Sequence, residues 1–246
     1  MNNFKSDTHM HFDLYRDRDA VLDYIEAQHS FTLAVTNLPE IYERYLGLYQ
    51  NYNYVRIALG FHPELASHYH HQVTTFRRLV SSTRYIGEVG LDYKTTDRSN
   101  KKIQRSVFNS IVEACESESN SKIISIHSRR AETDVIDIIR DVKRSKIIMH
   151  WYSGSLENME SALDLGCYFS INHNMIQSKA GKKIIDRIPL NRILIESDAP
   201  FTTGLKEVYS TSFMDSIYHY ISASNMISVD SVMATIRHNF SSMLKS

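Results

Sequence analysis

Residues 122–150 read KIISIHSRRAETDVIDIIRDVKRSKIIMH, and this stretch holds two short apolar runs that each end in a histidine, His127 and His150. Between the runs, apolar residues recur at the spacing of an amphipathic helix, at Val135, Ile138, Ile139 and Val142. Strands buried on both faces of a parallel sheet read as nearly continuous apolar runs. The stretch therefore predicts a strand, a helix and a second, parallel strand.

The rest of the chain repeats this alternation. Apolar runs of strand length lie near 4–9, 31–36, 54–59, 84–88, 122–127, 146–150, 167–171 and 192–197. Eight strands alternating with helices favour an α/β protein with a (β/α)8 TIM barrel, and a doubly wound sheet is the alternative. Two closing helices are expected at 205–222 and 229–244, the second capped by Ser228. No linker, repeat or low-complexity segment interrupts the chain, so we expect one domain over residues 1–246.

The charge balance and the cysteine content limit the classes of function. Lys and Arg total 28, as do Asp and Glu, so the chain lacks the basic excess of a protein that coats nucleic acid duplexes. Two cysteines give no disulfide framework, and the N-terminal residues lack the apolar core of a signal peptide. No apolar run approaches the length of a membrane span. We therefore expect a cytoplasmic protein with no membrane contact.

Six potential metal ligands lie at or just past the ends of the apolar runs, namely His9, His11, Glu88, His127, His150 and Asp198. Barrel enzymes collect catalytic residues at the carboxyl ends of their strands, so we expect these side chains to meet. Five of them have an ordinary alternative: a polar strand edge for the pair His9 and His11, an exposed turn for Glu88, and hydrogen-bonded structural residues for His127 and His150. Together they fill two adjacent sites for divalent ions, with nitrogen and oxygen ligands that favour zinc, manganese or similar ions.

Residues near the ligands have candidate roles of their own. Asp7 alternates with His9 and His11 and points to the same face of its strand. Asp92 is expected to support the site from a loop, and Glu196 to pair near it. Trp151 and Tyr152 are interpreted as packing the barrel mouth, with stacking on a base as the alternative. Cys167 and Phe169 are expected in the core, and the run His68, His70 and His71 on the solvated surface.

Seven stretches resemble, in order, the TatD family of metal-dependent deoxyribonucleases within the amidohydrolase-type barrels: DTHMHFD, ALGFHPE, YIGEVGLDY, ISIHSRRAETDVI, IMHWYSG, LGCYFSI and ILIESDAPF. They cover residues 7 to about 201. HFDLYRD, TLAVTN, HWYSGS and LGCYFSINHNM are most similar to the TatD-like nuclease of the Qat anti-phage defence system. The segment 202–213 departs from the family pattern, and HWYSG replaces the commoner HCFSG.

The resemblance implies an amidohydrolase-type (β/α)8 barrel that hydrolyses phosphodiester bonds in DNA with two divalent ions, Zn, Mn or Mg. It makes the six residues above the metal ligands, with Glu88 and Asp198 catalytic and Asp198 the base. It makes His62 and Arg129 substrate contacts. Expected partners are DNA, as single strands or ends, and other defence-system proteins.

Two other functions stay open at this point. One barrel serves many chemistries, so the same metals are also compatible with hydrolysis of a modified nucleotide, an amide or a lactone. A second alternative is a barrel that serves only as a partner-binding scaffold in a defence complex. Exonuclease action is favoured over cutting within a duplex, because the scissile phosphate must reach the strand ends and the charge is balanced.

Overall fold

The computed structural model describes residues 5–49, 51–94 and 97–245. Phe4, the first residue of the first predicted strand, lies outside them. The chain forms two compact units. The first consists of Met1–Ala34, Asn51–Arg56 and Tyr168–Ser246, and the second of Val35–Gln50 and Ile57–Cys167. The expectation of one domain over the whole chain stays a prediction.

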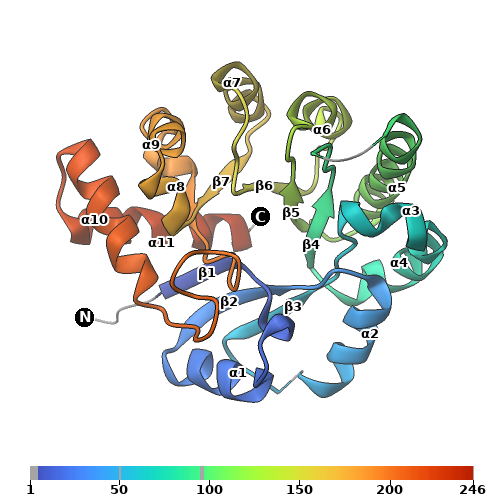
Figure 1. Ribbon diagram of the computed structural model, residues 1–246, viewed down its shortest axis with the longest axis horizontal. Coiled ribbons are helices and arrows are strands. Elements are labelled where there is room, and N and C mark those ends of the chain that lie inside the picture. The colour runs from blue at the N-terminus through green and yellow to red at the C-terminus, as the bar shows by residue number, and fades with distance from the viewer. Residues whose placement is uncertain (1–4, 50, 95–96, 246) are drawn as a thin grey trace. The chain divides into compact units, whose positions relative to one another are not determined.

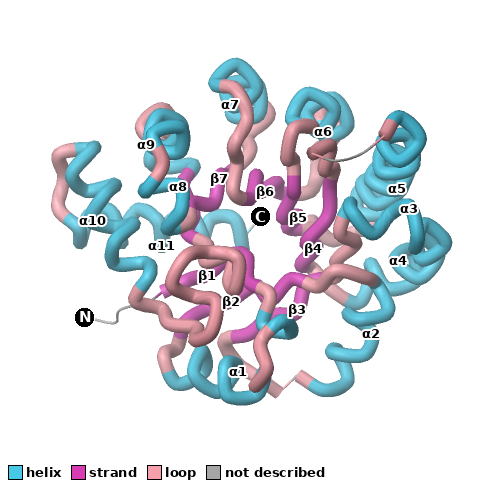
Figure 2. The backbone as a smooth tube through the Cα atoms, in the orientation of Figure 1, coloured by secondary structure: helices cyan, strands magenta, loops and turns pink. Residues whose placement is uncertain are grey.

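The eight predicted strands are confirmed, and their ends agree with the predicted ends to within two residues. They are β1 (Lys5–Met10), β2 (Ser30–Val35), β3 (Val55–Ala58), β4 (Tyr85–Gly90), β5 (Ile123–His127), β6 (Lys146–His150), β7 (Tyr168–Ile171) and β8 (Ile193–Ile195). Helices separate them: α1 (Arg18–Ala27), α2 (Pro39–Leu48), α3 (Ala66–Tyr69), α4 (Val73–Leu79), α5 (Arg98–Ser117), α6 (Glu132–Ile139), α7 (Leu156–Asp164), α8 (His173–Gln177) and α9 (Lys179–Ile185). The helices α10 (Phe213–Asn225) and α11 (Val229–Lys245) follow the last strand. Figure 2 shows the resulting alternation of strands and helices along the backbone.

In the second unit, β4, β5 and β6 pair in chain order and in parallel. Their residues Ile86, Ile124, Ile126 and Ile148 are almost fully buried. The helices α5, α6 and α7 stand side by side along this sheet (Figure 1). Each buried isoleucine contributes about 1.5–3 kcal/mol, so the apolar runs recognised in the sequence hold this sheet together.

Gly90 lets the end of β4 approach β5. Its φ is +135°, and a Cβ at this position would lie 2.1 Å from the carbonyl oxygen of His127. The next residue, Leu91, donates its N–H to that same oxygen at 2.9 Å. A side chain at residue 90 would therefore push apart the two strand ends that carry Glu88 and His127.

In the first unit, β1 pairs with β2 in parallel, and β7 pairs with β8. The last strand also meets the first: Asp198 donates its N–H to His9 O at 2.9 Å, and His11 donates to Ala199 O at 2.9 Å. The helix α11 packs against both β1 and β8. A barrel requires its first and last strands to meet in this way, and an open doubly wound sheet does not.

The segment after β8 corrects one helix prediction. A helix was expected at 205–222, but α10 begins only at Phe213. Tyr209 is buried and donates its hydroxyl to Asp7 Oδ2 at 2.8 Å, and Tyr15 donates to the carbonyl of Leu205. These side-chain bonds to distant parts of the chain hold the segment in a loop. The second closing helix is confirmed, with Ser228 Oγ accepting from the N–H of Ser231 at 3.2 Å.

Candidate functional site

The first unit brings His9, His11 and Asp198 together. Asp198 Oδ1 lies 3.8 Å from His9 Nε2 and 3.6 Å from His11 Nε2, and the two imidazole centroids are 5.2 Å apart. All three residues are buried, and one candidate ligand atom from each lies within 4.8 Å of the others. Two nitrogens and a carboxylate oxygen at this spacing fit a single divalent cation. We call these residues the first cluster.

Asp7 fixes the backbone under the first cluster. Asp7 is fully buried, and its carboxylate is occupied by hydrogen bonds. Its Oδ1 accepts from Ser197 N–H at 2.8 Å and from His9 N–H at 3.2 Å, and Oδ2 accepts from the Tyr209 hydroxyl. Burial raises the pKa of Asp7 to about 7, against the lowering effect of those hydrogen bonds. Asp7 therefore ties the end of β1 to the residue that precedes Asp198.

The local backbone places two ligands of the first cluster, His11 and Asp198, just beyond the ends of their strands. β1 ends at Met10, and its register with β2 shifts between Asp7 and Met10, so the strand curls before His11. Asp198 follows the end of β8 and adopts a φ of +46°, in the sparsely populated left-handed region. Ser197 and Ala199 beside it are buried.

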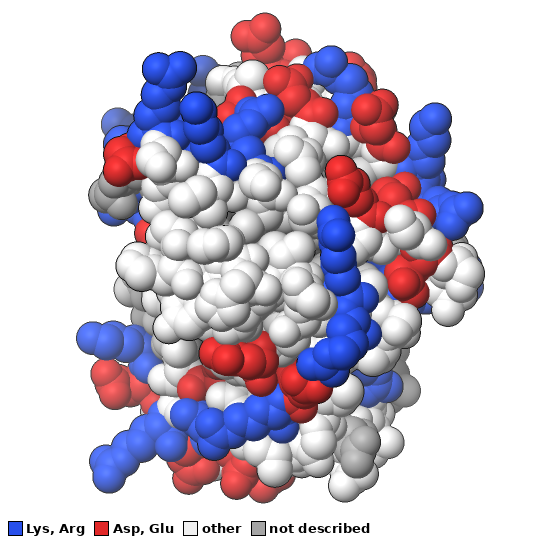
Figure 3. All heavy atoms as spheres, turned by 90° about the vertical axis from the view of Figure 1, so that its right-hand side faces the viewer, with Lys and Arg blue, Asp and Glu red and all other residues white. Residues whose placement is uncertain are grey.

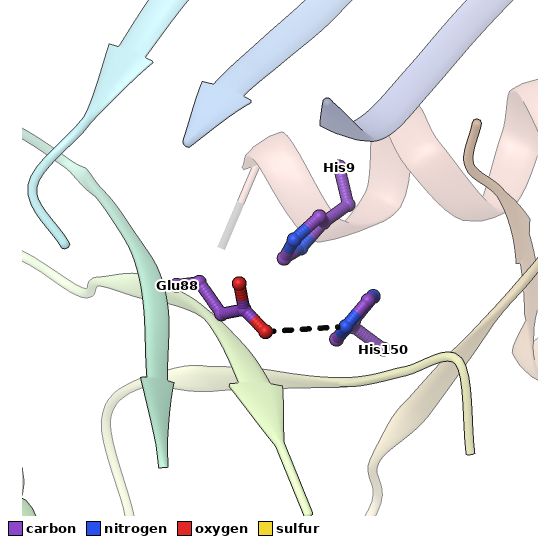
Figure 4. A group of neighbouring side chains, drawn as sticks. All are labelled: His9, Glu88 and His150. Atoms are coloured by element: carbon purple, nitrogen blue, oxygen red, sulfur yellow. Dashed lines mark ion pairs between the residues drawn. The ribbon is translucent and has the colours of Figure 1, made fainter. Parts of the chain in front are cut away.

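The second unit brings together Glu88, His127, His150 and His62, which we call the second cluster. Glu88 Oε1 lies 2.5 Å from His127 Nδ1 and 3.4 Å from His150 Nε2, and Oε2 lies 3.5 Å from His62 Nε2. Figure 4 shows Glu88 and His150 with their ion pair dashed. Glu88 is only 3% exposed, which excludes the alternative of an ordinary exposed turn. Both of its oxygens face nitrogen donors.

Backbone hydrogen bonds set the position of Glu88. Its N–H donates to Thr36 O at 3.2 Å, and its carbonyl accepts from Phe61 N–H at 2.8 Å. The Thr36 hydroxyl in turn donates to Ala58 O at 2.9 Å. The register between β4 and β5 shifts after Ile86, where the strand adapts to these contacts. The ends of β2, β3 and β4 are therefore joined directly beneath the carboxylate.

Asp92 supports His127, as the sequence predicted. Its Oδ2 lies 2.8 Å from His127 Nε2, and Gln104 holds the Asp92 backbone on both sides. Burial alone would lower the pKa of His127, but the charge of Glu88 and the hydrogen bonds to Asp92 and Glu88 outweigh burial and raise it to about 9. A carboxylate that accepts a hydrogen bond from one ring nitrogen of a histidine orients the other ring nitrogen toward a cation. The cation then replaces the proton on that second nitrogen. Nδ1 is the nitrogen that faces Glu88.

Within the second cluster, His62 lies close enough to Glu88 and His127 for these three residues to be ligands of one cation. Its Nδ1, however, accepts a hydrogen bond from the backbone N–H of Glu64 at 3.2 Å. A ring nitrogen that accepts carries no proton, so in the neutral ring Nε2 carries it. His62 therefore presents an N–H at Nε2 rather than a lone pair. This tautomer supports the predicted role as a substrate contact over a role as a ligand.

The remaining predicted residues fall as follows. Arg129 is exposed just beyond β5. Burial raises the pKa of Asp92, but the hydrogen bonds from His127 and Lys94 outweigh burial and lower the pKa, with a smaller contribution from the charge of Arg129. Glu196 is buried and accepts from Ser170 Oγ and Asn172 Nδ2, which confirms that it is paired.

Tyr152 is buried, as expected for packing, whereas Trp151 is half-buried with a φ of +36°. Buried Cys167 and Phe169 and exposed His68, His70 and His71 match their predictions.

Sequence reasoning did not single out Tyr209, Thr36 or Gln104. Tyr209 lies 202 residues from its partner Asp7, and its segment was predicted as helix, so no local pattern marked it. Thr36 acts through its backbone carbonyl and its hydroxyl, which composition does not reveal. Gln104 is fully buried in α5, and a single polar residue among buried apolar ones gives no periodic signal in the sequence. Only the fold shows that it reaches Asp92.

Known proteins are similar to this chain in sequence and in fold. The model of the family described as TatD related DNase matches residues 6–245. The chain belongs to this family. Among its TatD relatives, the uncharacterized metal-dependent hydrolase YabD of Bacillus subtilis (strain 168) is 31% identical over 209 residues, covering 80% of each chain. The deoxyribonuclease TATDN3 of Homo sapiens is 26% identical over 253 residues, covering 95% of this chain and 92% of the relative.

A solved structure of the same family shows the fold. The TatD homologue YJJV from Escherichia coli K12 superimposes with a TM-score of 0.85 and 21% identity, over 99% of this chain and 98% of YJJV. The TatD fold is an amidohydrolase-type α/β fold with parallel strands, consistent with the predicted (β/α)8 barrel. The chain is thus an enzyme of the TatD family of metal-dependent hydrolases.

Proposed function

We propose that the chain is a deoxyribonuclease that hydrolyses phosphodiester bonds with two divalent ions, Zn, Mn or Mg. Its ligands in this proposal are His9, His11, Glu88, His127, His150 and Asp198. The observation that carries the proposal is that every one of these residues lies in a histidine–carboxylate cluster of a TatD family chain. Relatives named as deoxyribonucleases support DNA as the substrate.

The side chains have distinct roles in this proposal. Bound divalent ions stabilise charge on phosphate oxygens and lower the pKa of water. Glu88 offers both carboxylate oxygens, since each faces a different nitrogen of the second cluster. Asp198, whose Oδ1 lies within 3.8 Å of His9 and His11, accepts the proton of the attacking water. His62 donates its Nε2–H to a phosphate oxygen, and exposed Arg129 pairs with the phosphate.

We propose that the enzyme acts as an exonuclease on single strands and free ends of DNA. The net charge is zero, and a long duplex track needs a continuous basic surface. On the face shown in Figure 3, basic and acidic side chains lie among each other around an uncharged area. Binding then depends on a few phosphates close to the ligands.

A place in anti-phage defence, with partner proteins of that system, is part of the proposal and is supported by the resemblance of HFDLYRD, TLAVTN and HWYSGS. Cytoplasmic action is proposed on the cysteine content, because two cysteines in 246 residues give no disulfide framework. Among the described residues, no helix has the length and apolar character needed to cross a bilayer.

A nuclease assay tests the proposal. The purified protein is supplied with Mn²⁺, Mg²⁺ or Zn²⁺ and given single-stranded, linear duplex and circular duplex DNA. We expect cleavage of substrates with ends, and a loss of at least about 100-fold in Glu88→Ala and His127→Ala, because each removes charge stabilisation worth several kcal/mol. The control His68→Ala removes an exposed histidine outside both clusters.

Three outcomes would contradict parts of the proposal. Equal activity of the wild type and both cluster variants would refute a metal-dependent nuclease. Activity on amides, lactones or modified nucleotides without activity on DNA would favour the other hydrolase function. Circular duplex cleaved as fast as linear duplex would refute exonuclease action.

A further inference from the structure

Two exposed apolar side chains lie next to the ligands of the first cluster. Phe201 is 59% exposed and Leu14 is 46% exposed, whereas the ligands His11 and Asp198 are almost fully buried. Leu14 is the third residue after His11, and Phe201 is the third residue after Asp198. Each of the two loops that leave the first cluster therefore places an apolar group in solvent close to a ligand.

Both side chains are held by turns that close on the ligands themselves. Phe201 donates its N–H to Asp198 O at 2.8 Å, and Leu14 donates its N–H to His11 O at 3.3 Å. Ala199 and Thr202, on either side of the Pro200–Phe201 pair, are buried. The exposed ring is thus carried by a backbone that cannot swing away without disturbing Asp198.

The Phe201 ring also touches a ligand directly. Its centroid lies 5.4 Å from that of the His11 imidazole, and the planes meet at 84°, an edge-to-face contact. This contact fixes the ring beside the first cluster, while more than half of the residue stays in solvent. An aromatic ring that is fixed and exposed presents a flat apolar surface at little further cost in conformational entropy.

We propose that Phe201, with Leu14 beside the other loop, binds the base of the nucleotide that flanks the scissile phosphate. This inference rests on the proposed function and deepens it. Bases stack on aromatic side chains regardless of sequence, because every base has an apolar face. A phosphate held at the first cluster brings the base of its own nucleotide near the Phe201 ring. Stacking there selects an unpaired end, since a base within a duplex is covered on both faces.

Kinetics on two matched oligonucleotides test the inference. Both are single strands of one length and are cleaved by the full-length protein with Mn²⁺, but one carries abasic residues in its last three positions. In Phe201→Ala we expect KM for the normal strand to rise roughly 5- to 100-fold, the worth of one stacked base, with kcat within about twofold. KM for the abasic strand stays unchanged, and Phe201→Tyr restores wild-type KM.

The control is Leu48→Ala, which removes an apolar side chain that is equally exposed, at 59%, on α2. It leaves KM unchanged for both strands, and Leu14→Ala raises KM for the normal strand less than Phe201→Ala does. Unchanged KM in Phe201→Ala, or equal rises for the normal and abasic strands, overturns the inference while the nuclease activity stands. A wild type that cleaves neither strand refutes the proposed function, and this inference with it.

Discussion

His62 is the residue at which hydrogen bonding decides between two roles. Its distance from Glu88 and His127 suits a ligand, but the Glu64 N–H occupies Nδ1 and leaves the proton on Nε2. We expect His62→Ala to retain the metal content and metal affinity of the wild type while kcat/KM falls about 10- to 100-fold, the worth of a hydrogen bond to a charged group. His62→Gln, whose amide replaces the Nε2 donor, regains part of this loss.

Metal analysis of the purified variants and a Mn²⁺ titration check the expectation, with exposed His68→Ala as the matched control. Loss of a metal equivalent in His62→Ala would show that His62 is a ligand. The tautomer argument would then be wrong.

Glu88, His127, His150 and Asp198 could be found from sequence because each lies at or just past the end of an apolar run, which is a local feature. The end of a run fixes the end of a strand, and parallel strands place their ends on one edge. The tautomer of His62 depends on a backbone turn, and the occupied carboxylate of Asp7 depends on Tyr209, 202 residues away. Such contacts follow from the folded chain and leave no periodic trace.

At the scale of elements, one carboxylate fastens the connection between α6 and β6. Glu116, at the end of α5, accepts from Lys143 N–H at 2.9 Å, from Arg144 N–H at 3.1 Å and from Ser145 N–H at 3.0 Å. Ser145 Oγ adds a fourth bond at 2.6 Å. Burial alone would raise the pKa of Glu116, but these hydrogen bonds outweigh it and hold the pKa below its usual range.

We expect Glu116→Gln to lower the free energy of unfolding at pH 7 by about 1–3 kcal/mol, because charged acceptors make the stronger hydrogen bonds. A carboxyl whose folded pKa is depressed stabilises the protein above its unfolded pKa, about 4.3, and loses this effect as pH falls through the folded pKa. The difference between the wild type and Glu116→Gln should therefore shrink below about pH 4.

Urea denaturation at several pH values measures this difference. Glu113→Gln, one turn earlier on α5, is the control, because its ion pair with Arg77 is exposed and long, at 3.7 Å. A Glu116→Gln penalty that stays constant between pH 7 and pH 3.5 would contradict the assignment to the charged carboxylate.

Elements with strong periodicity were predicted well, and the segment after β8 was not. Within α5, apolar residues recur every four positions at Val107, Ile111 and Cys115, and all three are buried. Residues 205–212 also have helical spacing, but the hydrogen bond from Tyr209 to Asp7 holds this segment in a loop instead of a helix. Tertiary hydrogen bonds overrode local propensity there, and propensity is a weak guide wherever such bonds form.

At the scale of the whole molecule, the balance of 28 basic and 28 acidic residues sets the salt dependence of DNA binding. Each phosphate neutralised on a single strand contributes about −0.7 to the slope of log K against log salt concentration. If only one to three phosphates near the ligands are bound, the slope lies between about −0.7 and −2. A protein that tracks a duplex shows a far steeper slope.

Fluorescence anisotropy of a labelled single strand measures this slope between about 50 and 300 mM salt, at a fixed concentration of divalent metal, with Glu88→Gln preventing cleavage. Adding Arg129→Ala should flatten the slope by about 0.7, because one phosphate contact is lost. Arg77→Ala removes an exposed arginine paired with Glu113 and should leave the slope unchanged. A slope steeper than about −4 would mean an extended basic track, and local binding near the ligands would then be wrong.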